Sequence, residues 1–225
     1  MTANVEPVDR SLGLAHKAWL ANPPHKNSPQ RTQKYQEALR DYLVAEGFTE
    51  STIKFDYPVP ALFSKSCDLV YAPFLFPRLA VSLKIIPLHE LSAHARTRLE
   101  EATGDAANIH GQYPELVLGY LWILPVDPQV SAQEGDWAIL RDAVRFLSRL
   151  AGRAGATDLS ARYEAVGVYV CSWARSQLPQ ADGKRHNKDL AKIRRQIPTF
   201  LTPAAMGRLL VASYRQRFGE LHEPP

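Results

Sequence analysis

The chain has 225 residues, of which 45% are hydrophobic and 22% charged, and its formal net charge is +4. This composition is that of an ordinary globular protein, and the length suits one filled core with a modest appendage. No apolar run approaches the roughly 20 residues that a membrane span needs, and the polar N-terminus lacks the layout of a secretory signal. We therefore expect a cytoplasmic protein with no membrane partner.

The first 30 residues end in a proline-containing loop at 22–29 and are predicted to form an N-terminal extension. A helix is expected over residues 31–47, because Tyr35, Leu39 and Tyr42 recur at helical spacing and Gly47 is suited to end it. A strand is expected next, at residues 52–59.

Two short strands are predicted at residues 67–71 and 78–86, and they carry the most informative residues of the chain. Side chains alternate between the faces of a strand, so Ser82 and Lys84 share a face. A lysine amid so much apolar sequence is costly to bury unless another group pairs with it. Asp68, on the preceding strand, is the candidate partner.

A helix predicted at residues 92–110 carries one continuous polar stripe. Its members recur at spacings of four and three: His94, Arg98, Glu101, Asp105 and Asn108. An exposed surface stripe is one explanation, and a place beside a functional site is the other. The position directly after the Lys84 strand favours the second.

The remaining elements alternate between strand and helix. Residues 116–124 are almost continuously apolar, which is typical of a strand covered on both faces. A helix is expected at 137–150, a strand at 163–173, a loop at 176–187 with Pro179 and Gly183 as turn residues, and helices after it, the last at 203–218. Cys67 and Cys171 fall in predicted strands, where we expect buried reduced thiols.

Positive charge is concentrated near the C-terminus. Residues 184–195 hold six basic side chains against Asp189, a net +5 in a chain whose total is +4: Lys184, Arg185, Lys188, Lys192, Arg194 and Arg195. Such a cluster is typical of a phosphate-binding surface, and a solvated helix face is the alternative.

Asp68, the Ser82-Leu83-Lys84 strand and the helix after it resemble the core of the PD-(D/E)xK nucleases, the fold of many restriction endonucleases. The predicted element order over residues 31–173 matches that core as well. The resemblance implies an α/β, restriction-endonuclease-like three-layer fold, in which a central mixed β-sheet is flanked by helices. The nuclease-like core would span residues 31–175, with a basic helical segment at 176–225 packed on it or appended to it.

The resemblance also implies an activity, which is Mg²⁺-dependent cleavage of double-stranded DNA in restriction or phage defence. Asp68 and the backbone carbonyl of Leu83 would ligate the metal, and Lys84 would orient or activate the attacking water. The basic residues expected to contact DNA are Arg98, Lys184, Arg185, Lys188, Lys192 and Arg195. Because cutting two strands commonly uses two active sites, we expect a homodimer.

The sequence departs from the family at two positions. Cys67 replaces a proline that carries no chemistry. Ser82 stands where the family has Asp or Glu, and a serine hydroxyl is a poor magnesium ligand, so we expect it to hydrogen-bond within the site.

The second carboxylate must then come from elsewhere, as in similar enzymes that carry it on the following helix. Glu100 and Glu101 are both candidates, and Glu101 is favoured because it lies one turn after Arg98. Arg98 would contact phosphate or brace Glu101. Glu37 is a third candidate, since similar enzymes place an acidic residue on the first helix, although it could also face solvent.

Two other functions stay open. A catalytically inactive DNA-binding or complex-assembly protein on the same fold is compatible with serine at position 82. A protein-interaction subunit without a nucleic-acid role is the third possibility. The motifs of phosphate-binding loops and of serine hydrolases are absent from the sequence.

Overall fold

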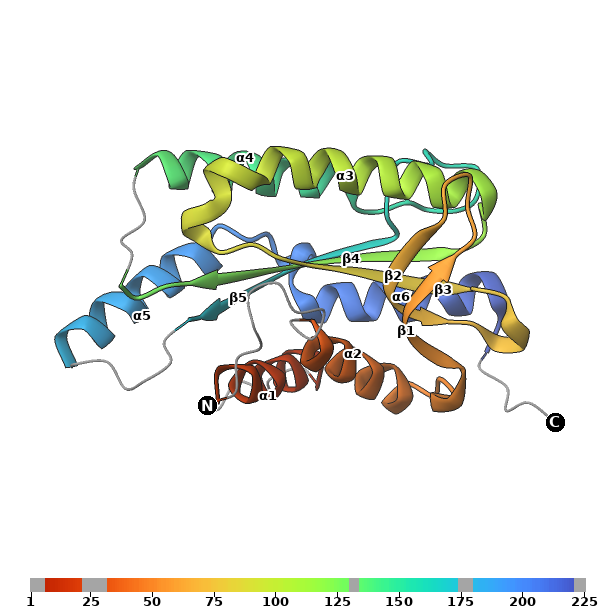
Figure 1. The fold of residues 1–225 in the computed structure, drawn as a ribbon, viewed down its shortest axis with the longest axis horizontal. Coiled ribbons are helices and arrows are strands. Elements are labelled where there is room, and N and C mark those ends of the chain that lie inside the picture. The colour runs from red at the N-terminus through yellow and green to blue at the C-terminus, as the bar shows by residue number, and fades with distance from the viewer. Residues whose placement is uncertain (1–6, 22–31, 130–133, 174–179, 221–225) are drawn as a thin grey trace.

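The protein is an α/β structure with one five-stranded mixed sheet and helices on both faces (Figure 1). The structure is a computed structural model that describes residues 7–21, 32–129, 134–173 and 180–220. Its helices are α1 (Pro7–Ala21), α2 (Gln33–Ala45), α3 (Leu91–Gln112), α4 (Glu134–Leu150), α5 (Gln180–Arg194) and α6 (Pro203–Phe218), and its strands are β1 (Ile53–Val59), β2 (Lys65–Tyr71), β3 (Leu79–Ile85), β4 (Val117–Val126) and β5 (Ala165–Ser172). Among these helices none is both long and apolar enough to cross a membrane.

The strands follow one another in space as they do in the chain, in the order β1-β2-β3-β4-β5. The first three are antiparallel neighbours, and β3, β4 and β5 are parallel to one another. Parallel neighbours need long crossover connections, which α3 and α4 supply here. Every residue of β4 is buried, which confirms the prediction of a strand covered on both faces.

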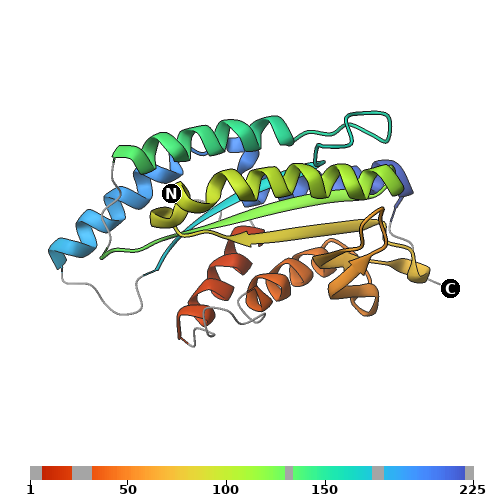
Figure 2. The same ribbon diagram turned by 45° about the horizontal axis from the view of Figure 1, so that its top comes forward.

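Two helical layers enclose the sheet, as the turned view shows (Figure 2). Side chains of α3 and α4 pack with one face, where the core includes Leu99, Leu118 and Leu147. Side chains of α1, α2 and α6 pack with the other face, where Leu12, Leu39 and Leu210 belong to the core. The described part of the N-terminal segment is therefore a packed helix of this second layer.

One predicted segment differs in the structure. The sequence predicts a loop over residues 176–187, but α5 already begins at Gln180 and contains Gly183; residues 174–179, with Pro179, lie outside the described residues. The buried side chains of His186, Leu190 and Ile193 recur at spacings of four and three, which is one face of a helix. His186 Nε2 is also hydrogen-bonded to Ser172 Oγ at 2.6 Å. Tertiary contacts of this kind stabilise the N-terminal part of α5, which the local sequence did not predict to be helical.

Close packing of α6 on the sheet depends on two glycines. A Cβ atom at Gly119 would lie 2.9 Å from Leu210 Cδ2, and one at Gly167 would lie 2.7 Å from Met206 Sδ. Both distances are shorter than side-chain carbon atoms tolerate, so β4 and β5 carry glycine where the helix crosses them.

A buried ionic cluster joins the start of β5 to three other segments. Glu164 Oε1 accepts hydrogen bonds from Arg153 at 2.8 Å and from Arg217 at 2.6 Å, and Oε2 accepts one from Leu118 N–H at 2.7 Å. His110 Nε2 lies 3.5 Å from the same carboxylate. Burial favours the neutral acid, but His110, Leu118 N–H and Arg153 outweigh burial and lower the pKa of Glu164 to about 2. The carboxylate is therefore ionised at neutral pH and holds α6 and the α3 terminus to the sheet.

Both cysteines are buried and free, as predicted. Burial raises the pKa of each thiol to about 12, which makes both poor nucleophiles.

Candidate functional site

Asp68 lies where β2 and β3 begin to separate. The β2–β3 ladder ends at the pair Leu69–Val81, and continuing its register places Asp68 opposite Ser82. Beyond the ladder, Asp68 Oδ2 accepts a hydrogen bond of 2.7 Å from the backbone N–H of Leu83. The group of Leu83 that meets Asp68 is thus the backbone N–H, whereas the sequence had suggested the Leu83 carbonyl as a metal ligand.

Charge and burial act on the Asp68 carboxylate in opposite directions. Burial raises its pKa, whereas the hydrogen bond from Leu83 and the positive charge of Lys84 lower it, and the net pKa lies above the usual range of an aspartate. Lys84 is half-buried near the end of β3. The structure therefore places Asp68 and Lys84 within electrostatic reach of one another, and the direct hydrogen bond goes to the backbone between Ser82 and Lys84.

Ser82 is buried, and its hydroxyl is hydrogen-bonded to the thiol of Cys67. Cys67 belongs to the same core cluster as Val70, although strict alternation along β2 would put them on opposite faces. The alternation breaks at Asp68, between these two residues. This irregularity lets Cys67 meet Ser82 while the carboxylate of Asp68 turns to Leu83.

Asp56 is a second carboxylate near Asp68, and the sequence analysis did not identify it. The β1–β2 register pairs Phe55 with Leu69 and Tyr57 with Cys67, so Asp56 stands opposite Asp68. The negative charge of Asp56 raises the pKa of Asp68. Its backbone has a φ of 48°, a left-handed conformation that aspartate tolerates better than most residues. An aspartate inside the β-rich sequence of β1 was the available signal.

Gln36 connects α2 to this pair of carboxylates. Its side chain is 1% exposed, and its Nε2 donates a hydrogen bond of 3.0 Å to Asp56 Oδ1. The neighbouring Glu37 instead bonds Lys34 at 2.9 Å and Gln33 at 3.1 Å, along the surface of α2. Gln36 therefore reaches Asp56 on β1, whereas Glu37 does not leave the surface of α2.

Arg98 is bonded to Glu101. This was one of the two predicted roles of Arg98, the other being a contact with phosphate. Arg98 Nη1 donates a hydrogen bond of 2.7 Å to Glu101 Oε2 on the same helix. Glu100, the other candidate on α3, bonds Arg96 at 2.8 Å, and both side chains are largely exposed. Of these two ion pairs, it is Arg98–Glu101 whose charges act on the hydroxyl of Tyr120, which stands beside Ser82 in the β3–β4 register.

Tyr120 has a buried hydroxyl without a hydrogen-bond partner among the described residues, and the indole Nε1 of Trp122 has none there either. In the register of the sheet these residues stand next to Ser82 and Lys84. Burial raises the pKa of Tyr120 well above its usual value, while Arg98 lowers it and the charges of Glu101, Asp105 and Asp68 raise it further. Orphaned polar atoms of this kind mark a place for water or a ligand.

Two residues of the predicted polar stripe, Asp105 and Asn108, hold the β1–β2 hairpin against α3, whereas His94 is exposed. Asp105 Oδ2 lies 2.8 Å from Lys65 Nζ. Asn108 exchanges two hydrogen bonds with the backbone of Phe63 at the hairpin tip, of 2.9 and 2.6 Å. These contacts fix β2, and with it Asp68, relative to α3.

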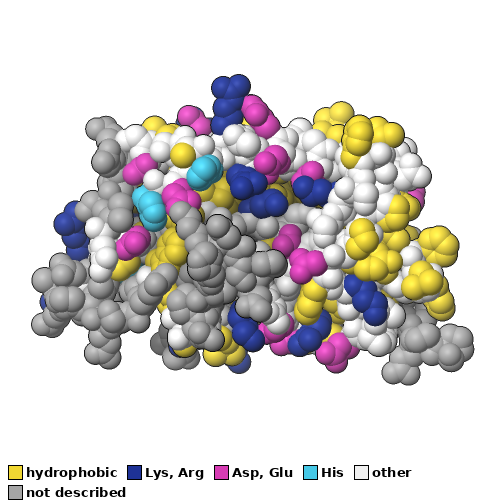
Figure 3. All heavy atoms as spheres, in the orientation of Figure 1, with side chains coloured by type: hydrophobic (Ala, Val, Ile, Leu, Met, Phe, Trp, Pro, Cys, Tyr) yellow, Lys and Arg dark blue, Asp and Glu magenta, His cyan; other side chains and the backbone are white. Residues whose placement is uncertain are grey.

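Acidic and basic side chains gather at the surface between the two helical layers, below α3 and above α2 in the view of Figure 3. No group of three or more His, Cys, Asp or Glu side chains stands ready to hold a metal ion in the part of the chain that the structure describes. The carboxylates of Asp56 and Asp68 come from facing positions of β1 and β2, and the charge of Asp56 acts on Asp68.

The basic cluster lies away from these residues. In both ribbon views α5 projects at the end of the molecule opposite the β1–β2 hairpin (Figures 1 and 2). Lys184, Arg185 and Lys188 are exposed, whereas the ammonium of Lys192 lies over the Trp137 ring, 4.1 Å from its centroid. Arg195 follows the helix and bonds the Ala191 carbonyl at 3.2 Å. The structure thus separates the cluster from Asp68 and Lys84.

Comparisons of the chain with family models, with curated proteins and with solved structures found no match.

Proposed function

We propose that this protein is a Mg²⁺-dependent endonuclease of the PD-(D/E)xK type that cleaves double-stranded DNA in restriction or phage defence. One observation carries the proposal: the Asp68 carboxylate is bonded to the backbone of β3 directly beside Lys84, at the point where β2 and β3 separate. The strand order supports the restriction-endonuclease-like fold, because an antiparallel β1–β2–β3 meander continues through α3 into the parallel strand β4.

Three carboxylates are candidate ligands for a hard cation, which prefers oxygen ligands, and metal binding would have to bring them together. Asp68 and Asp56 stand opposite one another on neighbouring strands, and Glu101 is held by Arg98 at the α3 side. The orphaned hydroxyl of Tyr120 fits such a site, because water bound to a cation would supply the missing hydrogen bond. Mg²⁺ bound there would polarise the scissile phosphate and lower the pKa of its water.

The chain's own residues have separate tasks in this proposal. Leu83 N–H orients the Asp68 carboxylate, and Gln36 orients that of Asp56. Lys84 holds a positive charge beside Asp68, where it can offset negative charge that develops on the phosphate. Ser82 positions Cys67 in the core and leaves ligation to the carboxylates.

The test is plasmid cleavage by the purified chain with Mg²⁺ or with EDTA. Metal-dependent conversion of supercoiled DNA supports the proposal. The second candidate function, a catalytically inactive DNA-binding or assembly protein, is favoured by the hydroxyl of Ser82 being engaged with Cys67. Salt-dependent DNA binding without metal-dependent cutting over a wide panel of sequences would select it, and absence of binding would select a protein-interaction subunit.

Sedimentation of the protein with and without DNA tests the proposed homodimer.

Glu101→Gln should lower the cleavage rate by about 10²-fold, because it removes a charge from the site while keeping the hydrogen bond of Arg98 possible. Glu37→Gln and Glu100→Gln are the matched controls, since both residues form local pairs on helix surfaces. The measurement is the single-turnover rate at saturating Mg²⁺. A slow Glu37 or Glu100 variant beside a normal Glu101 variant would reassign the carboxylate.

Replacing Lys188, Lys192 and Arg195 together by glutamine should weaken DNA binding for all sequences and reduce the slope of log K against log salt by about one unit per lost phosphate contact. The matched control is the triple replacement of three exposed arginines of α4, Arg141, Arg145 and Arg149. Fluorescence anisotropy at several salt concentrations measures both quantities. Equal effects of the two triple variants would show that α5 acts only through net charge.

A further inference from the structure

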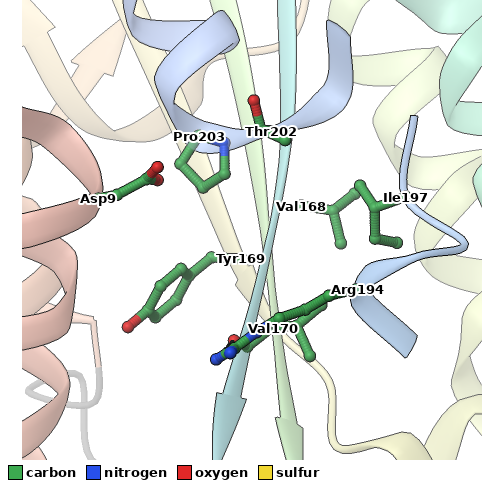
Figure 4. A pocket seen from close by; sticks show the side chains of 8 residues that line it. All are labelled: Asp9, Val168, Tyr169, Val170, Arg194, Ile197, Thr202 and Pro203. Atoms are coloured by element: carbon green, nitrogen blue, oxygen red, sulfur yellow. Dashed lines mark hydrogen bonds between the residues drawn. The ribbon is translucent and has the colours of Figure 1, made fainter. Parts of the chain in front are cut away.

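A cavity of about 390 Å³ lies at the free edge of β5, the edge of the sheet farthest from β1. Figure 4 shows the side chains that line it, and they come from α1, β5, α5, the segment after it, and α6: Asp9, Val168, Tyr169, Val170, Arg194, Ile197, Thr202 and Pro203. The cavity is distinct from the site around Asp68 and Lys84, which lies on β2 and β3. Nothing in the proposed nuclease chemistry uses its residues.

The backbone of β5 faces this cavity. The carbonyl of Val170 accepts a hydrogen bond from Arg194 Nη2 at 3.2 Å, and the carbonyl of Ser172 is bonded to His16 Nε2, both outside the sheet. Backbone groups of alternate residues point to the same side of a strand, so the N–H and C=O of Val168 point outward as well. An edge strand thus offers the cavity an adjacent donor and acceptor.

One positive and one negative side chain flank an aromatic ring in this cavity. Figure 4 shows Asp9 and Arg194 on different sides of the Tyr169 ring. Burial raises the pKa of the Tyr169 hydroxyl above its usual value, and Arg194 lowers it while Asp9 raises it, so both charges lie within electrostatic reach of the ring. Ile197 and Pro203 add apolar surface.

We propose that this cavity binds a nucleoside monophosphate. The Arg194 guanidinium has the planar fork that recognises phosphate, and Tyr169 with Pro203 provides flat apolar surface for a base. The Val168 backbone and the Asp9 carboxylate can satisfy the donors and acceptors of the base edge and the sugar hydroxyls. The volume lies near the lower end of the range for small-molecule pockets, about 300–1,000 Å³, which suits one nucleotide.

The experiment is isothermal titration of the full chain with each of the four ribonucleoside 5′-monophosphates, in EDTA so that no cation can recruit phosphate to Asp68. We expect saturable binding of at least one of them. Arg194→Gln should weaken that binding about tenfold or more, because a charge-assisted contact to phosphate is lost. Arg141→Gln, at an exposed position of α4, and Lys54→Ala, at an exposed position of β1, should bind like the wild type.

The corresponding nucleoside, which has no phosphate, should bind the wild type and Arg194→Gln alike. Asp9→Asn is the second variant, on a different helix, and it should change the order of preference among the four bases. Circular dichroism checks that each variant is folded. Lack of binding by the wild type at millimolar nucleotide overturns the proposal, as does unchanged binding in folded Arg194→Gln or, if that variant does not fold, in Asp9→Asn.

Discussion

Asp68→Ala should lower the rate of Mg²⁺-dependent DNA cleavage by about 10²–10³-fold or more while leaving DNA affinity nearly unchanged. Its carboxylate is held at Leu83 N–H beside Lys84, where in the proposed mechanism it would act on the reacting phosphate and contribute little to the rest of the DNA contact. Lys84→Ala should have an effect of the same size, because it removes the positive charge from the same place. Single-turnover cleavage measures the rate, and anisotropy in EDTA measures affinity.

Matched controls exist for both variants. Asp41→Ala removes an exposed carboxylate of α2 that is bonded to Arg40, and Lys54→Ala removes an exposed ammonium of β1. Both should cut DNA at the wild-type rate. If Asp68→Ala or Lys84→Ala also cut normally, the assignment of the site to β2 and β3 would be wrong even if the protein is a nuclease.

The pH dependence of cleavage should reflect the environment of Asp68. Because burial raises its pKa, this carboxylate takes up a proton at a higher pH than an ordinary aspartate does as the solution is acidified. Protonation would remove the charge that binds the cation in the proposed mechanism. At subsaturating Mg²⁺ the acidic limb of the rate profile should therefore begin above the usual aspartate range and move to lower pH as Mg²⁺ is raised. A limb that does not move with Mg²⁺ would contradict this explanation.

Glu164→Gln should lower the free energy of unfolding by about 3–5 kcal/mol, the largest stability effect that we expect from one substitution. The substitution leaves Arg153 and Arg217, which are almost completely buried, without their shared carboxylate. Glu50→Gln is the control, since it breaks an exposed ion pair with Arg40 and should change stability by about 0.5 kcal/mol or less. Urea unfolding at neutral pH measures both variants.

The sign of the pH effect follows from the pKa of Glu164, which folding lowers from 4.5 to about 2. The folded state binds this proton less readily than the unfolded state, so the stabilisation is complete above about pH 4.5 and is lost as the pH falls toward 2. The stability difference between wild type and Glu164→Gln should shrink over that interval. A difference that is constant from pH 7 to pH 3 would show that the carboxylate is not the source of the effect.

Local sequence predicted the elements well where one signal dominated. The apolar run of β4, the alternation in β3 and the helical spacing in α2 each placed an element within about two residues of its position in the structure. The predicted start of α5 was wrong, because Gly183 suggested a turn. The buried side of the helix depends on a tertiary contact, the hydrogen bond between His186 and Ser172. This contact stabilises the helix through tertiary packing, which cannot be predicted from local sequence spacing.

The residues of the candidate site likewise fall into those predicted from the sequence and those found only in the structure. Ser82 and Lys84 were identified from strand alternation and Asp68 from its place on the preceding strand, while Glu101 was chosen, on the helix that the resemblance indicated, from its spacing to Arg98. Gln36 and Asp56 were missed because their hydrogen bond joins α2 to β1, and neither residue belongs to a local pattern. Glu37 was considered instead, although it lies on the part of the α2 surface that pairs with Lys34.

The sequence by itself determined the type and order of the elements, because the spacing of apolar residues records which side of a helix or strand is buried. It also determined that Asp68 and Lys84 come from successive strands. Tertiary structure alone decided which distant polar groups meet: Asn108 with the backbone of Phe63, Glu164 with Arg217, and Asp9 with Arg194 around one cavity. Such meetings depend on how the helical layers pack on the sheet, and the packing is set by the whole core and not by any local spacing of residues.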